Sequence, residues 1–271
     1  MIKTIGIALL CAGAVIAQDG PEKATVPLQD PARPVRIRAH LLAGSITVHG
    51  ADVKDVVVEA KGRGREERES RPERADGMKR LDMPGNAGLE VSEDNNVVNI
   101  KTSSMNRPSD LVITVPRHSS LELKAVNDGD IYVEQVDGEI DANDLNGKIT
   151  LKNVSGSVVA HSLNGAVLVT MDRIDAGKPM SFSTMNGDID VTLPSDLKAN
   201  VRMKTDNGEI YSDFEVKLES GTQMVQGESG RQANGSYRVR FDRMLRGTIN
   251  GGGPEFQFIS FNGQIFIRRK K

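Results

Sequence analysis

The feature that most constrains the fold is a series of glycines spaced nine residues apart. Gly129, Gly138, Gly147, Gly156 and Gly165 each begin the same phrase, in which one exposed residue is followed by alternating apolar and polar residues. Strict alternation predicts short strands with one buried face. The side chains expected to point inward are Ile131, Val133, Val136, Ile140, Ala142, Leu145, Ile149, Leu151, Val154, Val158, Ala160, Leu163, Val167 and Val169.

A slower period lies on top of the nine-residue period. Asn-Gly or Asp-Gly pairs end at Gly129, Gly147, Gly165, Gly187 and Gly208, and the corners between them are Val-Asp-Gly or Val-Ser-Gly. The unit is therefore about 18–22 residues long, with two strands and two corners. Such a unit cannot bury its apolar face alone, but copies stacked ~4.8 Å apart would close a continuous core. The sequence predicts an all-β fold, a single-stranded parallel β-helix or β-solenoid.

A β-sandwich built of hairpins is the alternative fold, because Asn-Gly also marks two-residue hairpin turns. A sandwich has no reason to keep an unbroken nine-residue register across five corners, so the solenoid is favoured.

Stacking would align the residues that precede the corner glycines. These residues are Asp128, Asn146, Asn164, Asn186 and Asn207. Asn, Asp and Gly tolerate left-handed backbone, so turn formation is the favoured interpretation of this row. A row of ligand-binding amides is the alternative.

The repeat extends on both sides of this central region. A degenerate coil at Ala43–Val48 continues into Val56–Val58, and a final coil covers Phe261–Ile267. We expect one solenoid domain over residues 35–271, with loop insertions near 61–90 and 221–236. The first insertion carries Arg and Glu of both signs, which favours a solvated excursion over an Arg-rich binding patch. The second is rich in Gly, Gln and Ser and indicates a flexible loop.

The amino terminus has the pattern of a secretory signal. Lys3 precedes an apolar run from Ile5 to Ile16, and small residues stand before a cleavage point after Ala17. We expect a signal peptide at 1–17 and a flexible segment at 18–34; an uncleaved anchor and lipidation of Cys11 are weaker alternatives. Cys11 is the only cysteine, so the mature chain would have no disulfide and no thiolate. The expected location is beyond the inner membrane, in the periplasm or at the cell surface.

Charge and motifs exclude several function classes. The chain has 35 basic and 37 acidic side chains, whereas nucleic-acid and polybasic membrane-surface proteins need a basic excess. It has no phosphate loop, dinucleotide fingerprint or nucleophile elbow. The residues after the nine-spaced glycines vary in charge, which argues against a calcium-binding nonapeptide solenoid. The histidines are scattered and are expected at surface or corner positions, not as metal ligands: His40, His49, His118 and His161.

Aromatic residues suggest two further features. Tyr132 and Tyr211 occupy equivalent outward positions and would make a sparse platform for a sugar. Four phenylalanines near the carboxyl end are expected to close the last coil, with a partner-docking patch as the alternative: Phe256, Phe258, Phe261 and Phe266. The closing cations Arg268 to Lys271 would discourage edge-to-edge growth from a terminal strand.

The combination of Leu/Val-Pro, a polar corner, an alternating strand and Asn-Gly-Asp-Ile resembles the bacterial putative-adhesin family of unknown function. The residues that carry the resemblance are Pro116–Val133, Met185–Val191, Pro194–Tyr211, Gly251–Pro254 and Asn262–Ile265. It covers residues 35–270 and implies a right-handed β-helix, as also found in adhesin head domains. The family has no established catalytic residues, so the resemblance carries none over.

The sequence therefore predicts a non-catalytic, secreted β-solenoid that acts as an adhesin-like interaction module of the cell envelope. We expect no catalytic residue, no cofactor and no metal. The partner would be an envelope or surface protein or glycan, with no nucleic acid and no membrane span after signal cleavage. A periplasmic structural or envelope-stress accessory protein and a glycan-active β-helix enzyme are the alternatives.

Overall fold

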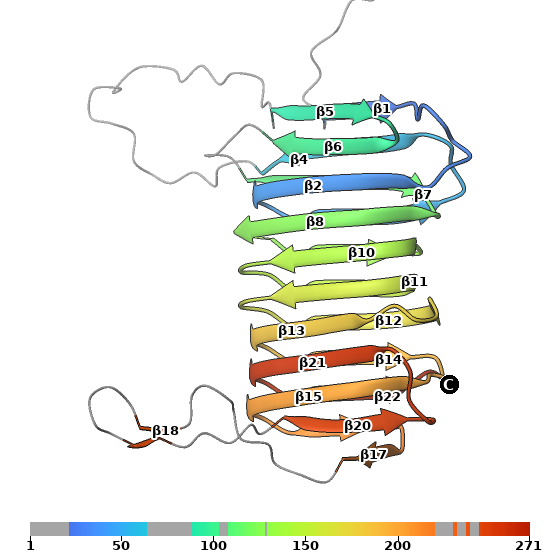
Figure 1. The fold of residues 1–271 in the computed structure, drawn as a ribbon. Coiled ribbons are helices and arrows are strands. Elements are labelled where there is room, and N and C mark those ends of the chain that lie inside the picture. Colours follow the sequence, from blue (N-terminus) through green and yellow to red (C-terminus); the bar gives the residue numbers. More distant parts are fainter. Residues whose placement is uncertain are drawn as a thin grey trace, which may run out of the picture.

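The fold consists of strands folded into two facing layers (Figure 1). The computed structural model describes residues 22–63, 88–102, 108–127, 129–219, 230–231, 237–238 and 244–271. Within these ranges no helix is long and apolar enough to cross a membrane. Twenty strands form one sheet, and β18 (Gly230–Arg231) and β19 (Tyr237–Arg238) pair separately. The expected all-β class is confirmed.

Layer A contains the strands that face the viewer in Figure 1. In spatial order these are β5 (Leu89–Asp94), β6 (Val97–Thr102), β2 (Val35–Ala43), β8 (Ser119–Asn127), β10 (Asp137–Asp144), the second half of β11 (Ile149–Ser162), β13 (Met180–Asn186), β21 (Glu255–Asn262), β15 (Ala199–Asn207), β20 (Leu245–Ile249) and β17 (Val216–Leu218).

Layer B lies behind layer A. In spatial order it consists of β1 (Glu22–Val26), β4 (Val56–Gly62), β7 (Ser109–Pro116), β3 (Ile46–Ala51), β9 (Ile131–Glu134), the first half of β11, β12 (Val167–Ile174), β14 (Ile189–Leu193), β22 (Ile265–Arg269) and β16 (Ile210–Ser212). One strand of each layer forms a coil, and the coils stack in a solenoid-like manner.

Equivalent residues of neighbouring coils pair in parallel. Ile131 lies beside Ile149, Ile149 beside Val167, and Val167 beside Ile189, which are steps of 18, 18 and 22 residues. The predicted coil length is confirmed. The strands are short because each coil must turn twice within that length.

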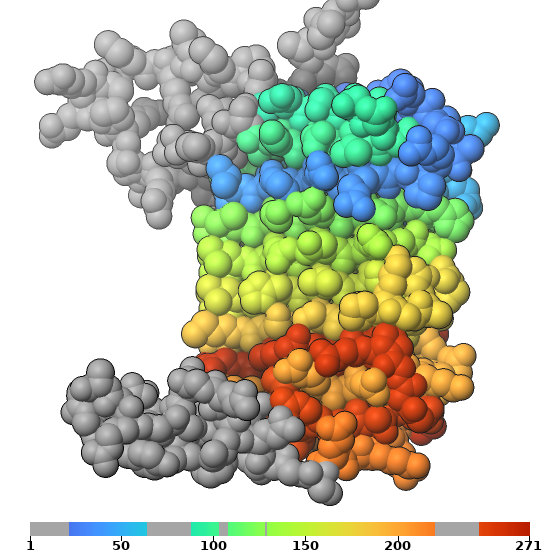
Figure 2. Space-filling view, viewed as in Figure 1, coloured from blue at the N-terminus to red at the C-terminus, as the bar shows by residue number. Residues whose placement is uncertain are grey.

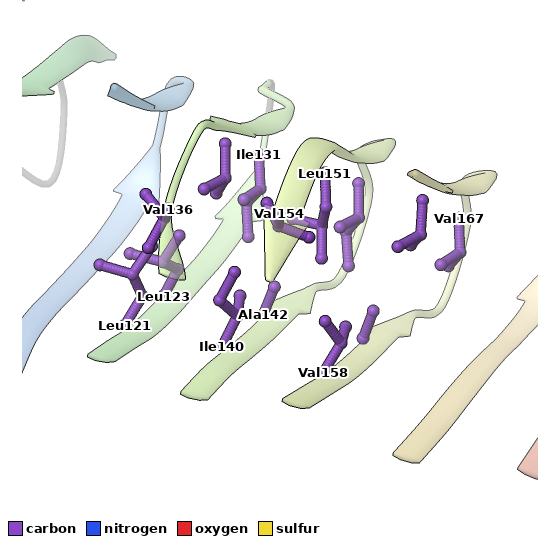
Figure 3. Packing of buried hydrophobic residues seen from close by; sticks show 14 of the residues in the cluster. Leu121, Leu123, Ile131, Val136, Ile140, Ala142, Leu151, Val154, Val158 and Val167 are labelled. Carbon is purple, nitrogen blue, oxygen red and sulfur yellow. The ribbon is translucent and has the colours of Figure 1, made fainter. Parts of the chain in front are cut away.

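The core is a set of aliphatic columns between the layers (Figure 3). Ile131, Ile149, Val167, Ile189 and Ile265 form one column, and each is fully buried. A fully buried side chain of this size contributes about 1.5–3 kcal/mol to stability. Because the column repeats from coil to coil, each coil supplies the buried surface that its neighbour lacks.

Two residues expected in the core are displaced from it. Leu145 is 41% exposed and Leu163 is partly exposed, whereas Asp144 and Ser162 are buried. The alternation that begins at Ile140 continues through Ala142 to residue 144, and so the next residue points outward. At these two positions the alternation along the strand, and not the apolar character of the side chain, determines which side chain is buried.

The coils do not stack in the order of the sequence. β2 pairs with both β6 and β8, so the coil 35–51 lies between coils 97–116 and 119–134. β21 pairs with both β13 and β15, so the coil 255–269 lies between coils 180–193 and 199–212. Both intercalations are visible in Figure 1 as breaks in the colour sequence.

The carboxyl-terminal coil is therefore internal, and two expectations about it are wrong. Phe256 and Phe258 are buried between two other coils and do not close the last coil, while Phe261 is exposed. Arg268 lies in the internal strand β22 and Lys270 directly follows it, and they pair with Asp190 and Asp172 of neighbouring segments. They do not protect a terminal edge.

Antiparallel strands cover most of the sheet ends. β4 runs antiparallel to β7, so Val56–Val58 does not continue the coil of Ala43–Val48 as expected. β1 lies within the segment 18–34, and β5 begins at Leu89 within the expected insertion 61–90. Most of the two expected insertions lies outside the described residues. Such covering strands limit pairing with other chains. β16 pairs with β22 alone among the described strands.

The corner glycines are required by close approach of neighbouring coils. A Cβ on Gly147 would lie 2.0 Å from the Gly129 carbonyl oxygen, and one on Gly165 would lie 2.1 Å from that of Gly147. Gly147 and Asn146 do not have positive φ, so the expected left-handed backbone is wrong at this corner. Lack of a side chain, and not backbone freedom, selects glycine here.

Candidate functional site

An asparagine ladder follows the corner that ends the strands of layer A. It consists of Asn127, Asn146, Asn164, Asn186, Asn262 and Asn207. Each side-chain amide donates to the Oδ1 atom of the preceding asparagine over 2.7–3.0 Å. The predicted alignment of Asn146, Asn164, Asn186 and Asn207 is confirmed; Asp128 lies outside the described residues.

The ladder uses its amides within the protein. An interior member such as Asn164 donates to Asn146 and accepts from Asn186. Amide groups paired in this way stabilise the corner and have fewer bonds left for a ligand. Asn262 was not expected between Asn186 and Asn207, because its place depends on the intercalated coil.

A polar column lies beside this ladder, inside the corner. Ser162, Thr184, Ser260 and Thr205 donate hydroxyl hydrogen bonds to the carbonyls of Gly147, Gly165, Gly187 and Gly263 over 2.8–3.1 Å. These bonds satisfy corner carbonyls that would otherwise be buried without a donor.

Asp144 occupies the same column with a carboxyl group in place of a hydroxyl. Its Oδ1 accepts from the Asn146 backbone N–H at 3.1 Å, whereas its Oδ2 has no hydrogen-bond partner. Burial raises the pKa of the Asp144 carboxyl to about 6, and the Asp130 charge adds to the rise. A buried ionisable group in a structural column affects stability more directly than binding.

An aromatic ledge lies on the outer surface of layer B, at its carboxyl-terminal end. We define the ledge by Asp190, Glu209, Tyr211, Phe266 and Arg268. The rings of Tyr211 and Phe266 stack with centroids 5.3 Å apart and planes inclined by 8°. The Arg268 guanidinium lies 5.1 Å from the Phe266 centroid and pairs with both Asp190 oxygens at 2.7 and 2.9 Å. The ledge thus combines an aromatic surface with fixed charges.

The ledge is exposed to solvent on the outer surface of layer B. Tyr211 belongs to β16, and its side chain is 46% exposed. Its hydroxyl hydrogen-bonds to the Glu209 carboxylate, which raises the pKa of Tyr211. The exposed ring offers an apolar surface, and the carboxylate beside it accepts hydrogen bonds.

Tyr132, the expected second member of the platform, lies several coils away. It occupies the same outward column, separated from Tyr211 by Thr150, Leu168, Asp190 and Phe266. Its hydroxyl donates to Glu134 at 2.7 Å, and the same carboxyl group contacts His49 Nδ1 at 2.8 Å. These bonds lower the pKa of Glu134. The two tyrosines therefore do not form one platform, and Phe266 takes that role beside Tyr211.

The other histidines also lie at the surface. His40 and His118 are near Glu122 and Asp137, and His161 contacts the Ser183 hydroxyl at 2.7 Å. No group of three or more metal-binding side chains occurs in the part of the chain that the structure describes.

The surface is hollowed only slightly. One open hollow of about 360 Å³ lies beside β15 and β20, and one of about 230 Å³ crosses layer A near Arg36 and Glu139. Charged residues on this layer pair with one another, for example Lys178 with Glu139 at 2.7 Å and Arg173 with Asp137 at 2.6 Å.

Comparison with known proteins finds a family model that matches part of the chain. Residues 127–250 match the model of the Toastrack DUF4097 family, which confirms the family resemblance expected from the sequence. No curated protein matches the chain. One similar solved structure is described as a "putative cell adhesion protein" from Clostridium sporogenes (10% identity, 92% of this chain, 100% of that chain, TM-score 0.47). Another is described as a "putative adhesin" from Bacteroides fragilis (12% identity, 94% of this chain, 99% of that chain, TM-score 0.41).

Proposed function

We propose, from the match of residues 127–250 to the Toastrack DUF4097 family model, that this chain is a non-catalytic, adhesin-like interaction module of the cell envelope. The observation that carries the proposal is the aromatic ledge, an exposed stacked pair with charged groups at its margin on an otherwise regular stack. The right-handed winding expected of parallel crossovers belongs to this proposal.

The ledge is suited to a glycan. The exposed face of Tyr211 can pack against the apolar face of a sugar ring, and Glu209 can accept hydrogen bonds from its hydroxyls. Arg268 is held by two bonds to Asp190, so its free donors are pre-oriented beside the ring. A fixed site of this kind loses little conformational entropy on binding.

A titration of the purified chain with envelope glycans tests this site. Tyr211→Ala should reduce glycan affinity at least about tenfold, the loss expected when a central aromatic contact is removed. Tyr132→Ala is the matched control, because it removes an aromatic ring from the same outward column without touching the ledge. Equal affinities of the two variants would argue against the ledge as the binding site.

Export and location are separate parts of the proposal. Signal peptide cleavage after Ala17 would give a mature chain beginning at Gln18. Mass spectrometry of the exported chain checks that end. Digestion of intact cells with added protease then separates surface display from a periplasmic accessory role, because only a surface-exposed module is cut.

A further inference from the structure

The largest ordered row of exposed apolar side chains follows the corner of layer A. We call this row the apolar ridge. It takes one residue from each of six stacked coils: Leu42, Val126, Leu145, Leu163, Met185 and Phe261. Leu42, Leu145, Met185 and Phe261 are between 41% and 48% exposed. The ridge follows the arrowhead ends of β8, β10, β11, β13 and β21, which are on the left in Figure 1; Figure 2 shows the surface of the same stack.

The ridge is straight and regularly spaced. Neighbouring coils are ~4.8 Å apart, so six coils give a row about 24 Å long. Scattered exposed apolar residues need no explanation, but a contiguous row marks an interaction surface.

The two sides of the ridge differ in charge. The strand side of the ridge, two residues before each ridge residue, carries Lys124 and Lys204 among uncharged polar or apolar residues and histidines. Lys124 pairs with Glu122 at 2.8 Å, and Lys204 lies 3.7 Å from Asp206. The other side of the ridge lies beyond the asparagine ladder, at the position after each corner glycine. It carries Asp130, Asp188 and Glu209, and Lys148 occupies the same position in one coil. We call these the basic flank and the acidic flank.

We propose that the apolar ridge is a dimer interface that binds the ridge of a second copy, with the two stacks parallel and related by a two-fold axis along the stack. A second copy has the same coil spacing, so each ridge residue meets its own counterpart along the whole row. Rotation about the stack axis also places the basic flank of one copy against the acidic flank of the other.

The clearest charge match in this arrangement is in the coil of Val126. Lys124 and Asp130 both belong to that coil, so Lys124 of each copy meets Asp130 of the other. The coil of Lys204 and Glu209 lies beyond the ridge, and Asp206 occupies the ridge position there. In the coil of Ser183 and Asp188 a hydroxyl faces a carboxylate. The reversed orientation would place Asp130 against Asp188 and leave Lys124 against Ser183, which electrostatic complementarity disfavours.

An anionic membrane surface fits the ridge less well. Membrane-surface segments flank their apolar side chains with cations on the polar face. Here one flank is acidic, with a net excess of carboxylates over lysine. The second copy satisfies both flanks, whereas a lipid surface satisfies only one.

Sedimentation equilibrium of the full chain over a range of concentrations tests the association. We expect a monomer–dimer equilibrium that Leu145→Glu combined with Met185→Glu abolishes, while both proteins have the same thermal unfolding midpoint at a concentration where the wild type is monomeric. Leu218→Glu is the matched control, because Leu218 is 56% exposed on β17, away from the ridge, and it should leave the dimer intact. A monomer at all concentrations up to the solubility limit, or a dimer insensitive to the ridge variants, would overturn the proposal.

Cysteine cross-linking tests the parallel orientation. In a Cys11→Ser chain, Leu145→Cys alone and Met185→Cys alone should each give a disulfide-linked dimer on mild oxidation. The reversed orientation instead pairs residue 145 with residue 163, so a disulfide only between Leu145→Cys and Leu163→Cys chains would overturn the arrangement.

Charge reversal tests the flanks. Lys124→Glu should weaken the dimer about tenfold, as two surface ion pairs are lost by symmetry. Adding Asp130→Lys exchanges both partners and should restore the affinity. Failure of the double variant to recover, with the ridge variants still monomeric, would overturn the parallel pairing of the flanks.

Discussion

Asp144 lies in parallel register with Ser162 on the neighbouring coil, and both side chains are buried in the same polar column. The Ser162 hydroxyl donates to the Gly147 carbonyl at 2.9 Å, but one oxygen of the Asp144 carboxyl has no partner. The same backbone position thus holds a neutral donor in one coil and an ionisable group in the next.

Asp144→Ser should stabilise the protein at neutral pH. The folded-state pKa of about 6 lies above the ordinary aspartate pKa of 3.8, so the folded protein binds this proton more tightly than the unfolded chain. The resulting penalty is absent below about pH 4, grows as the pH rises towards 6, and is complete above it. We expect a gain on the order of 2 kcal/mol at pH 7.5 and little gain at pH 4.

Urea unfolding of the wild type and the variant at several pH values measures this difference. Asp141→Ser on the same strand is the control, because Asp141 is exposed and should show no such pH-dependent gain. A gain from Asp144→Ser that is equal at pH 4 and pH 7.5 would contradict the role of the carboxylate.

Gly147→Val should be strongly destabilising because any Cβ there would overlap the Gly129 carbonyl oxygen. We expect a loss of more than about 3 kcal/mol, since coil spacing would have to change. Gly62→Ala serves as the control: a Cβ at Gly62 meets nothing within 4 Å. Similar thermal unfolding midpoints for the two variants would show that the neighbouring coils can accommodate a side chain at residue 147.

Ile149→Asp should prevent stable folding, whereas Lys148→Asp should change stability by less than about 1 kcal/mol. Ile149 is fully buried between Ile131 and Val167, where a carboxylate would have no partner. Lys148 is the adjacent exposed residue. Circular dichroism with thermal unfolding distinguishes the two, and matching midpoints would contradict the side-chain orientations.

Asn164→Ala should cost more stability than Asn207→Ala. Asn164 both donates and accepts in the ladder, whereas Asn207 stands at its end and only donates. At about 1 kcal/mol for each lost hydrogen bond, the difference should be about 1 kcal/mol. Chemical unfolding of both variants measures it, and the reverse order would indicate that the ladder is not continuous.

The regular part of this fold follows from local pattern. Alternation identified the buried column through Ile149, and the Asn-Gly corners identified the row of asparagines. The error at Leu145 arose because an apolar residue at the end of a strand was placed by its type and not by its position in the alternation.

The spatial order of the coils depends on long-range competition between similar surfaces. Ile265 pairs with both Ile189 and Ile210. The sequence pattern would allow Ile189 and Ile210 to pair directly with each other equally well. Sequence periodicity cannot distinguish these arrangements. The aromatic ledge was missed for the same reason, because Phe266 reaches Tyr211 only through the intercalated coil.

The internal position of residues 255–269 also determines when folding can finish. Coils 180–193 and 199–212 are synthesised earlier, but the segment that joins them is the last to be made. Until residues 255–269 are made, these two coils would remain unjoined, each with an exposed strand edge. A chain built this way completes the native pairing of this region only after residues 255–269 have been synthesised.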